Sequence, residues 1–227
     1  LAQYEEYKDV GGRNLGTKAY KDLDFSKIKL ADSGAAVVME VDTGNILATA
    51  SYPSFDLNLF ASGISEEDFN KLKDDPAFPL YNKAVSSHGT PGSIFKMVTG
   101  LGALMEGATT LTEKIDDEGL FDKYTKDNPE DSPKCAAYPK RISRHQNQTI
   151  VEGLQHSCNP IFMQLAMDVG LDRYYDSILK FGFNQKLGID FNAESKGYVR
   201  DRNSVPLQDL ARIGFGQSIS VTPLQTI

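Results

Sequence analysis

The sequence lacks several features that mark other classes of protein. Its 227 residues contain no tryptophan and only two cysteines, and 24 Lys and Arg against 31 Asp and Glu give a net charge of −7. Two cysteines do not make the disulfide framework of a small secreted domain, and an acidic chain argues against nucleic acid as a partner. No run of about 18 apolar residues, the length that spans a bilayer, is present. We therefore expect a folded domain with a substantial core.

What the sequence does contain is a serine and a lysine three residues apart, in the segment Pro91-Gly92-Ser93-Ile94-Phe95-Lys96. On a helix this spacing places Ser93 and Lys96 on one face, and the free N–H groups of the first turn favour a developing alkoxide. A lysine kept neutral by burial can accept the proton of a serine. The pair is therefore a predicted nucleophile and base. Taken alone, four residues fit an exposed lysine beside a capping serine equally well.

A second motif follows downstream, where Ser157-Cys158-Asn159 has the pattern S-x-N. The capping box Thr149-Ile150-Val151-Glu152 predicts a short helix before it, and Pro160 predicts the start of another helix after it. S-x-x-K together with a serine motif of this kind is typical of penicillin-binding proteins and serine β-lactamases.

With these motifs the chain resembles the transpeptidase domain of class B penicillin-binding proteins. The matching stretches occur in the family's order: residues 35–48, 51–58, 82–84, 91–96, 157–162 and 216–225. The resemblance implies an α/β (α+β) fold, in which helices flank an antiparallel sheet and form a helical subdomain. Residues 1–33 are expected to be a lead-in segment from an upstream region, and residues 34–227 the transpeptidase domain.

One departure concerns the family's third motif, K-T-G, which occurs nowhere in the sequence. In the family this motif lies on a strand beyond the stretch that matches residues 216–225. We therefore expect an excised and incomplete domain that holds only the first two strands of the sheet, the hairpin of residues 35–41 and 46–50. A fragment of this kind is expected to be poorly active or inactive.

The resemblance also implies roles for four residues. Ser93 would attack the carbonyl between the two D-alanines of a peptidoglycan stem peptide, Lys96 would take its proton, and Ser157 would pass a proton to the leaving nitrogen. Asn159 would bind the substrate amide and hold Lys96. No cofactor or metal is implied. The expected partners are stem peptides, β-lactams and other cell-wall synthesis proteins, and the expected location is the outer face of the cytoplasmic membrane, with an anchor helix upstream.

Three other functions share these motifs: a β-lactamase, a β-lactam sensor and an inactive cell-wall scaffold. A β-lactamase needs a carboxylate base that we do not find, and a sensor should lack the matches at residues 51–58 and 216–225. An inactive scaffold is hard to reconcile with the presence of all four proposed site residues.

The least informative part of the sequence is residues 108–148, in which we expect the acidic run 116–118 and the stretch 122–134 to form an exposed excursion. Cys135, His145 and His156 could supply metal ligands, but their spacing matches no compact zinc pattern, and we prefer unrelated surface and core roles for them. Elsewhere we expect a helix opened by Ser65, one from Ser93 to about Glu106, one at residues 171–181, one at 207–213 and one that starts near Val221. The helix at 171–181 should bury Leu171, Tyr174, Tyr175, Ile178 and Leu179.

Overall fold

The computed structural model describes residues 32–123, 132–139 and 145–227, and the statements below concern these residues. The predicted lead-in segment therefore lies almost wholly outside the described part of the chain. Among the described residues no helix is both long and apolar enough to cross a membrane.

The predicted hairpin is confirmed. Strand β1 (Gly34–Met39) pairs antiparallel with β2 (Ile46–Tyr52), in a register that sets Gly34 opposite Tyr52. The turn between them closes with a hydrogen bond from the Gly44 N–H to the Glu40 carbonyl, and Gly44 takes a positive φ that suits glycine. Val37 of β1 packs beside Ala84, Val85 and Leu224.

A second strand pair, which the sequence analysis did not predict, lies apart from this hairpin. β3 (Tyr198–Val199) pairs antiparallel with β4 (Ile219–Ser220) in a separate two-stranded sheet. Strands of two residues are too short to produce an alternating pattern, so nothing in the sequence distinguished them from loops.

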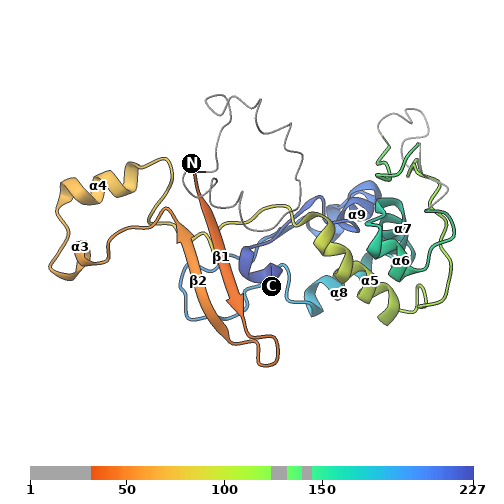
Figure 1. The fold of residues 1–227 in the computed structure, drawn as a ribbon, viewed down its shortest axis with the longest axis horizontal. Helices are drawn as coiled ribbons and strands as arrows, with labels where there is room; N and C mark the ends of the chain where they lie inside the picture. Colours follow the sequence, from red (N-terminus) through yellow and green to blue (C-terminus); the bar gives the residue numbers. More distant parts are fainter. Residues whose placement is uncertain (1–31, 124–131, 140–144) are drawn as a thin grey trace, which may run out of the picture. The chain divides into compact units, whose positions relative to one another are not determined.

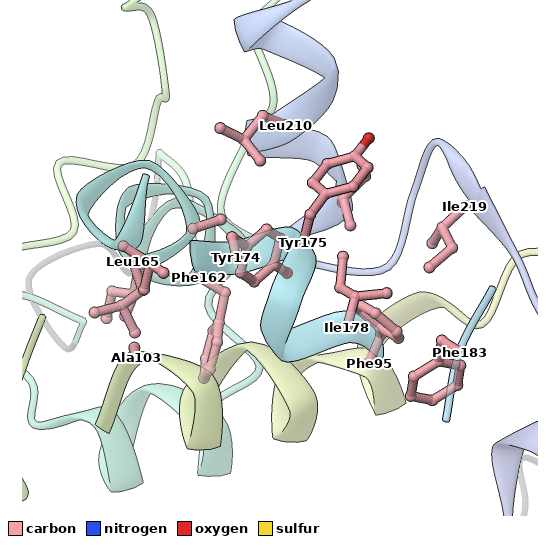
Figure 2. Close-up of a cluster of buried hydrophobic side chains, with 14 of the residues drawn as sticks. Phe95, Ala103, Phe162, Leu165, Tyr174, Tyr175, Ile178, Phe183, Leu210 and Ile219 are labelled. Carbon is pink, nitrogen blue, oxygen red and sulfur yellow. The ribbon is translucent and has the colours of Figure 1, made fainter. Parts of the chain in front are cut away.

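The helices α5 to α9 form the main core (Figure 1). Helix α5 (Lys96–Met105) packs against α7 (Asn159–Val169) and α8 (Leu171–Lys180), and α7 also packs against α9 (Leu207–Ile213). Figure 2 shows the side chains between them, with Phe162 and Tyr174 in the middle and Phe95 beside Phe183 at one edge. The rings of Phe95 and Phe183 meet edge to face, with their centroids 5.1 Å apart.

Helix α8 confirms most of its predicted buried face. Tyr174, Tyr175 and Ile178 are buried, whereas Leu179 is 39% exposed, so the prediction for Leu179 was wrong. Leu179 is next to Ile178 in sequence, and a step of about 100° along a helix turns it away from the buried stripe.

Polar groups inside the core fix the position of α5. Thr99, which is fully buried, donates a hydrogen bond from its hydroxyl to the Gly214 carbonyl at 2.8 Å and shares another with the Tyr174 hydroxyl at 2.6 Å. Gly214 lies so close to α7 that a Cβ there would sit 2.3 Å from the Phe162 carbonyl oxygen. These contacts hold α5 against α8 and α9 one turn after Lys96.

Helix caps confirm the starts predicted at Ser65 and Thr149. Ser65 caps α4 (Glu66–Asp74), and complete capping boxes open α6 (Ile150–Gln155) at Thr149 and α10 (Pro223–Thr226) at Thr222. Two further short elements are α3 (Asn58–Ala61) and the 3₁₀ turn Arg202–Ser204.

Two expectations need correction. The helix expected from Ser93 begins as a 3₁₀ turn, η2 (Gly92–Phe95), and α5 proper starts at Lys96. The excursion expected at residues 116–118 and 122–134 is not uniformly exposed, because Asp117 and Ser132 are buried. Polar composition predicted exposure there, but burial at these positions depends on contacts with residues far along the chain.

Candidate active site

Ser93 lies on the 3₁₀ turn η2, which a second segment of the chain holds in place. The Gly92 N–H donates to the Gly216 carbonyl at 3.0 Å, and a Cβ on Gly216 would sit 2.0 Å from the Gly92 oxygen. Gly216 also has a φ of +81°. Only glycine permits both the approach and this backbone conformation. Gly216 therefore positions the turn that carries Ser93, a role that the sequence alone did not reveal.

Ser157 approaches from the C-terminal end of α6 in an uncommon conformation. Its φ is +56°, a left-handed value that costs a residue other than glycine about 1–3 kcal/mol. In this conformation both its carbonyl and its hydroxyl oxygen lie within hydrogen-bonding distance of the Lys96 amine. Asn159, the first residue of α7, follows two positions later.

The structure brings all four predicted site residues together around the amine of Lys96. Lys96 Nζ lies 3.2 Å from Ser93 Oγ, 2.9 Å from Ser157 Oγ, 2.7 Å from the Ser157 carbonyl oxygen and 2.7 Å from Asn159 Oδ1. Ser157 Oγ is in turn 3.0 Å from Ser93 Oγ. The two serine hydroxyls and the amine thus form a closed triangle of hydrogen-bonding distances.

The chemical types of these neighbours indicate how a neutral amine would bond. The Ser157 carbonyl and Asn159 Oδ1 can only accept hydrogen bonds, so they match the two N–H groups of an uncharged amine. The hydroxyls of Ser93 and Ser157 can donate, and either can point a proton at the nitrogen lone pair. An arrangement with two pure acceptors and two possible donors suits an amine that takes a proton from a hydroxyl.

Burial favours the uncharged form of this amine. Lys96 is fully buried, and desolvation lowers the pKa of its amine from 10.5 to about 8, partly opposed by Cys158 and Cys135 nearby. Ser93 remains exposed at the surface. The site therefore combines an accessible hydroxyl with a buried amine whose pKa is close to neutral pH, the combination that general base catalysis requires.

A second cluster of titratable side chains lies next to this site. Asp117, Cys135, His145 and Cys158 each direct a possible ligand atom to one place, and these four atoms lie within 4.8 Å of one another. Cys135 and His145, which we expected to occupy unrelated surface and core positions, thus lie next to each other in space, and that expectation was wrong. His156, the third residue considered, stacks on His145 instead.

Asp117 and Cys158 were missed as members of this cluster. Asp117 stands in an acidic run that suggested an exposed loop, and Cys158 was interpreted as a small residue that fills a tight turn. A compositional signal was present, because both cysteines and two of the three histidines fall within residues 135–158.

Comparison with known families gives one match over most of the chain. Residues 34–227 match the family model described as "Penicillin binding protein transpeptidase domain". Lys96 and the three residues around its amine all lie in the matched range.

Individual relatives and solved structures agree with this match. The chain is 33% identical to the peptidoglycan D,D-transpeptidase MrdA of Acinetobacter baumannii over 92% of this chain and 32% of that protein. It is 32% identical to stage V sporulation protein D of Bacillus subtilis, over 91% of this chain and 29% of that protein. The structure also superimposes on the penicillin-binding protein PBP2 of Helicobacter pylori, solved in complex with MreC, with a TM-score of 0.72. The two sequences are 26% identical, and the superposition covers 86% of this chain and 36% of the other. The chain thus spans about a third of the length of the relatives that it matches.

Proposed function

The chain belongs to the penicillin-binding protein transpeptidase family, in its class B branch, and on this premise we propose that the protein containing it is a peptidoglycan D,D-transpeptidase with Ser93 as nucleophile. The observation that carries the proposal is the buried Lys96 amine, which lies within hydrogen-bonding distance of Ser93, Ser157 and Asn159.

The first half-reaction forms an ester on Ser93. Ser93 Oγ attacks the carbonyl carbon between the two terminal D-alanines while Lys96 accepts its proton, and the backbone N–H of Ser93 stabilises the oxyanion. The tetrahedral intermediate then collapses, the C–N bond breaks, and the amine of the terminal D-alanine leaves with a proton. Ser157 lies at 2.9 Å from Lys96 Nζ and 3.0 Å from Ser93 Oγ, which suits it to pass that proton from the lysine to the leaving nitrogen.

The second half-reaction runs the same steps in reverse with another amine. An amino group from a neighbouring stem peptide attacks the ester carbonyl and gives up a proton, and Ser93 regains its hydroxyl proton as the acyl group leaves. Asn159 has two tasks in this scheme. Its Oδ1 accepts from Lys96 at 2.7 Å. Among the described residues its Nδ2 makes a long contact of 3.4 Å with the Lys134 carbonyl, so this group is suited to donate to the substrate.

The proposed substrates and partners follow from the family. Stem peptides ending in D-Ala-D-Ala would be donors, and β-lactams, whose ring carbonyl stands in for the same amide, would acylate Ser93 and remain bound. We place the protein at the outer face of the cytoplasmic membrane. Because the H. pylori relative was solved with MreC, we propose a partner among the cell-wall synthesis proteins here as well. No nucleic acid is expected among the partners.

The competing functions are less well supported. A β-lactamase must hydrolyse its acyl-enzyme quickly, and the relatives at 30% identity or more that we describe are not β-lactamases. The sensor and the inactive scaffold likewise find no support among these relatives. The K-T-G motif, absent from these 227 residues, supplies substrate contacts in the family, so the tests below use the full-length protein that contains this chain.

A peptide assay tests the proposal directly. The full-length protein is incubated with a stem pentapeptide ending in D-Ala-D-Ala and a labelled D-amino acid as the acceptor amine, and products are measured by mass spectrometry. We expect one D-alanine released for each labelled peptide formed, and no reaction with a tetrapeptide that lacks the terminal D-alanine. Release of D-alanine with hydrolysis as its only product, or no reaction from a folded protein, would contradict the transpeptidase assignment.

The pH dependence of acylation should report the Lys96 amine. Because the pKa of Lys96 is lowered to about 8 and the neutral amine is the base, the fraction of active enzyme rises about tenfold per pH unit below that value and levels off above it. We expect the second-order rate constant for acylation by a penicillin to follow this curve between pH 6 and 9. A rate that falls as the pH rises across this range would assign the proton-accepting role to another group.

A further inference from the structure

The turn that carries Ser93 keeps a 3₁₀ conformation as far as Lys96. The 3₁₀ turn η2 covers Gly92–Phe95, and the backbone at Phe95 (φ −67°, ψ −16°) and at Lys96 (φ −59°, ψ −26°) has dihedral angles close to those of a 3₁₀-helix. In a 3₁₀-helix, side chains three positions apart lie directly above one another, whereas in an α-helix they are offset by about 60° around the axis. The 3₁₀ form therefore aligns the hydroxyl of Ser93 with the amine of Lys96.

This conformation needs support from outside the turn. The hydrogen bonds of a 3₁₀ turn have poorer geometry than those of an α-helix. Pro91 and Phe95, which occupy the N-cap positions of η2 and α5, have side chains without hydrogen-bonding atoms, so neither caps the turn. Gly92 itself has a φ of +62°, outside the helical range. We therefore looked for contacts from other segments that hold the turn.

The segment of residues 214–216, which we call the clamp segment, contacts this turn at two points. At the first point the Gly92 N–H, one residue before the nucleophile, donates to the Gly216 carbonyl at 3.0 Å. At the second point the Thr99 hydroxyl, three residues after the base, donates to the Gly214 carbonyl at 2.8 Å. Two carbonyl groups of one short segment thus hold the chain on both sides of the nucleophile and the base.

The clamp segment is itself fixed against α7. A Cβ on Gly214 would sit 2.3 Å from the Phe162 carbonyl oxygen and 3.0 Å from the Ala166 Cβ, so the backbone of Gly214 lies directly on this helix. Helix α7 begins with Asn159, whose Oδ1 is 2.7 Å from Lys96 Nζ. The clamp segment therefore positions the turn of the first motif relative to the helix that carries the second.

The contact made by Thr99 depends on Tyr174. Thr99 is fully buried, and its hydroxyl has a single proton, which it donates to the Gly214 carbonyl. The Tyr174 hydroxyl, 2.6 Å away, must then donate its own proton to Thr99 Oγ1. Burial raises the pKa of Tyr174, so this proton is retained. The Phe95 carbonyl, at 3.4 Å from Thr99 Oγ1, is a more distant alternative acceptor. Tyr174 thus helps to keep the Thr99 hydroxyl directed at Gly214.

We propose that Thr99 and Tyr174 are positioning residues for acylation: through the Gly214 carbonyl they hold the turn in the 3₁₀ form that places Ser93 Oγ 3.2 Å from Lys96 Nζ. Both act through the backbone of the turn and not on the substrate. Without the hydroxyl of Thr99 the turn is free to relax towards an α-helix, in which the two reacting side chains diverge. The inference rests on the proposed function, because it concerns the rate of acylation.

Acylation of the full-length protein by a penicillin, measured over a range of penicillin concentrations, tests this role. Thr99→Val keeps nearly the same shape and removes the hydroxyl. We expect the limiting acylation rate to fall about tenfold or more, because small displacements of reacting groups are costly. The penicillin concentration that gives half of this rate should stay close to the wild-type value. Thr99→Ser retains the hydroxyl and should restore most of the rate, and Tyr174→Phe should lie between Thr99→Val and the wild-type protein.

Ser177→Ala is the matched control. Ser177 is also buried where α8 faces α5, beside Gly102, but its hydroxyl donates to the Arg173 carbonyl within its own helix at 3.0 Å. We expect Ser177→Ala to lower the thermal stability and leave the limiting rate unchanged. If Ser177→Ala lost as much rate as Thr99→Val, the effect would belong to the α5–α8 interface in general, and the positioning role would be overturned.

The remaining outcomes separate this role from the proposed function. A wild-type limiting rate in folded Thr99→Val would overturn the role of Thr99. If Thr99→Val fails to fold, Tyr174→Phe provides the test, and a wild-type rate in that variant would overturn the proposal. Failure of the wild-type protein itself to acylate would refute the proposed function, a result that differs from normal acylation in every variant.

Discussion

Replacing Ser93 by alanine is expected to abolish covalent labelling by a penicillin. The wild-type full-length protein should gain one penicillin mass in intact-protein mass spectrometry, because the exposed hydroxyl of Ser93 is 3.2 Å from a buried amine that can take its proton. Ser93→Ala removes the only atom that would form the ester, so labelling should fall to the background rate, a loss of at least 10⁴-fold by analogy with other serine acyl transferases.

Ser87→Ala is a suitable control for this experiment. Ser87 lies six residues before Ser93, and its hydroxyl donates to the Lys83 carbonyl rather than to the active-site amine. The control variant should label like the wild-type protein. A stable adduct on folded Ser93→Ala would identify another nucleophile and overturn the acyl-transfer mechanism, whereas rapid loss of the adduct from the wild-type protein would favour a β-lactamase.

Lys96→Ala should be nearly as damaging to acylation. Removing a general base typically costs 10²–10⁴-fold in rate, and this variant also leaves the Ser157 carbonyl and Asn159 Oδ1 without their donor. We expect a fall of about 10³-fold in the acylation rate constant, with the fold largely retained, since α5 is also held through Thr99. Stopped-flow or time-resolved mass measurements of penicillin acylation, with circular dichroism to monitor folding, check both parts.

Lys83→Ala provides the matched control for a buried lysine. Lys83 is 8% exposed, and its amine donates to the Phe78 carbonyl rather than to any residue of the site. Loss of stability should therefore be comparable in the two variants, while only Lys96→Ala loses acylation. If a well-folded Lys96→Ala protein acylated at the wild-type rate, Lys96 would not be the base.

Much of the local structure was predictable because short-range chemistry determines it. The hairpin, the capping box at Thr149 and the buried tyrosines of α8 each depend on residues a few positions apart. Lys96 and the three residues around its amine were predicted from two short motifs and the family resemblance. Their distances were not, since Ser93 and Ser157 are 64 positions apart in the sequence.

What escaped prediction depends on contacts between distant segments. The approach of Gly216 to Gly92 joins residues far apart in the sequence, and a glycine is too common to indicate such a contact by itself. The four-residue cluster gathers Asp117, Cys135, His145 and Cys158 from irregular chain, where ligand spacing follows no fixed pattern. The start of α5 was placed three residues too early because a 3₁₀ turn and an α-helix have similar sequence preferences.

The hydrogen bond from Lys96 to the carbonyl of Ser157 has a consequence for genetics. A carbonyl belongs to every amino acid, so codon changes at position 157 can delete the hydroxyl but never this acceptor. In a library that places every amino acid at position 157, the side chain available for proton transfer would vary from clone to clone. The hydrogen bond from Lys96 to the backbone carbonyl would be kept in each clone whose new residue tolerates a φ near +56°. Glycine and asparagine tolerate that backbone best. Such clones would separate the chemistry of Ser157 from its architecture, which alanine scanning alone does not do.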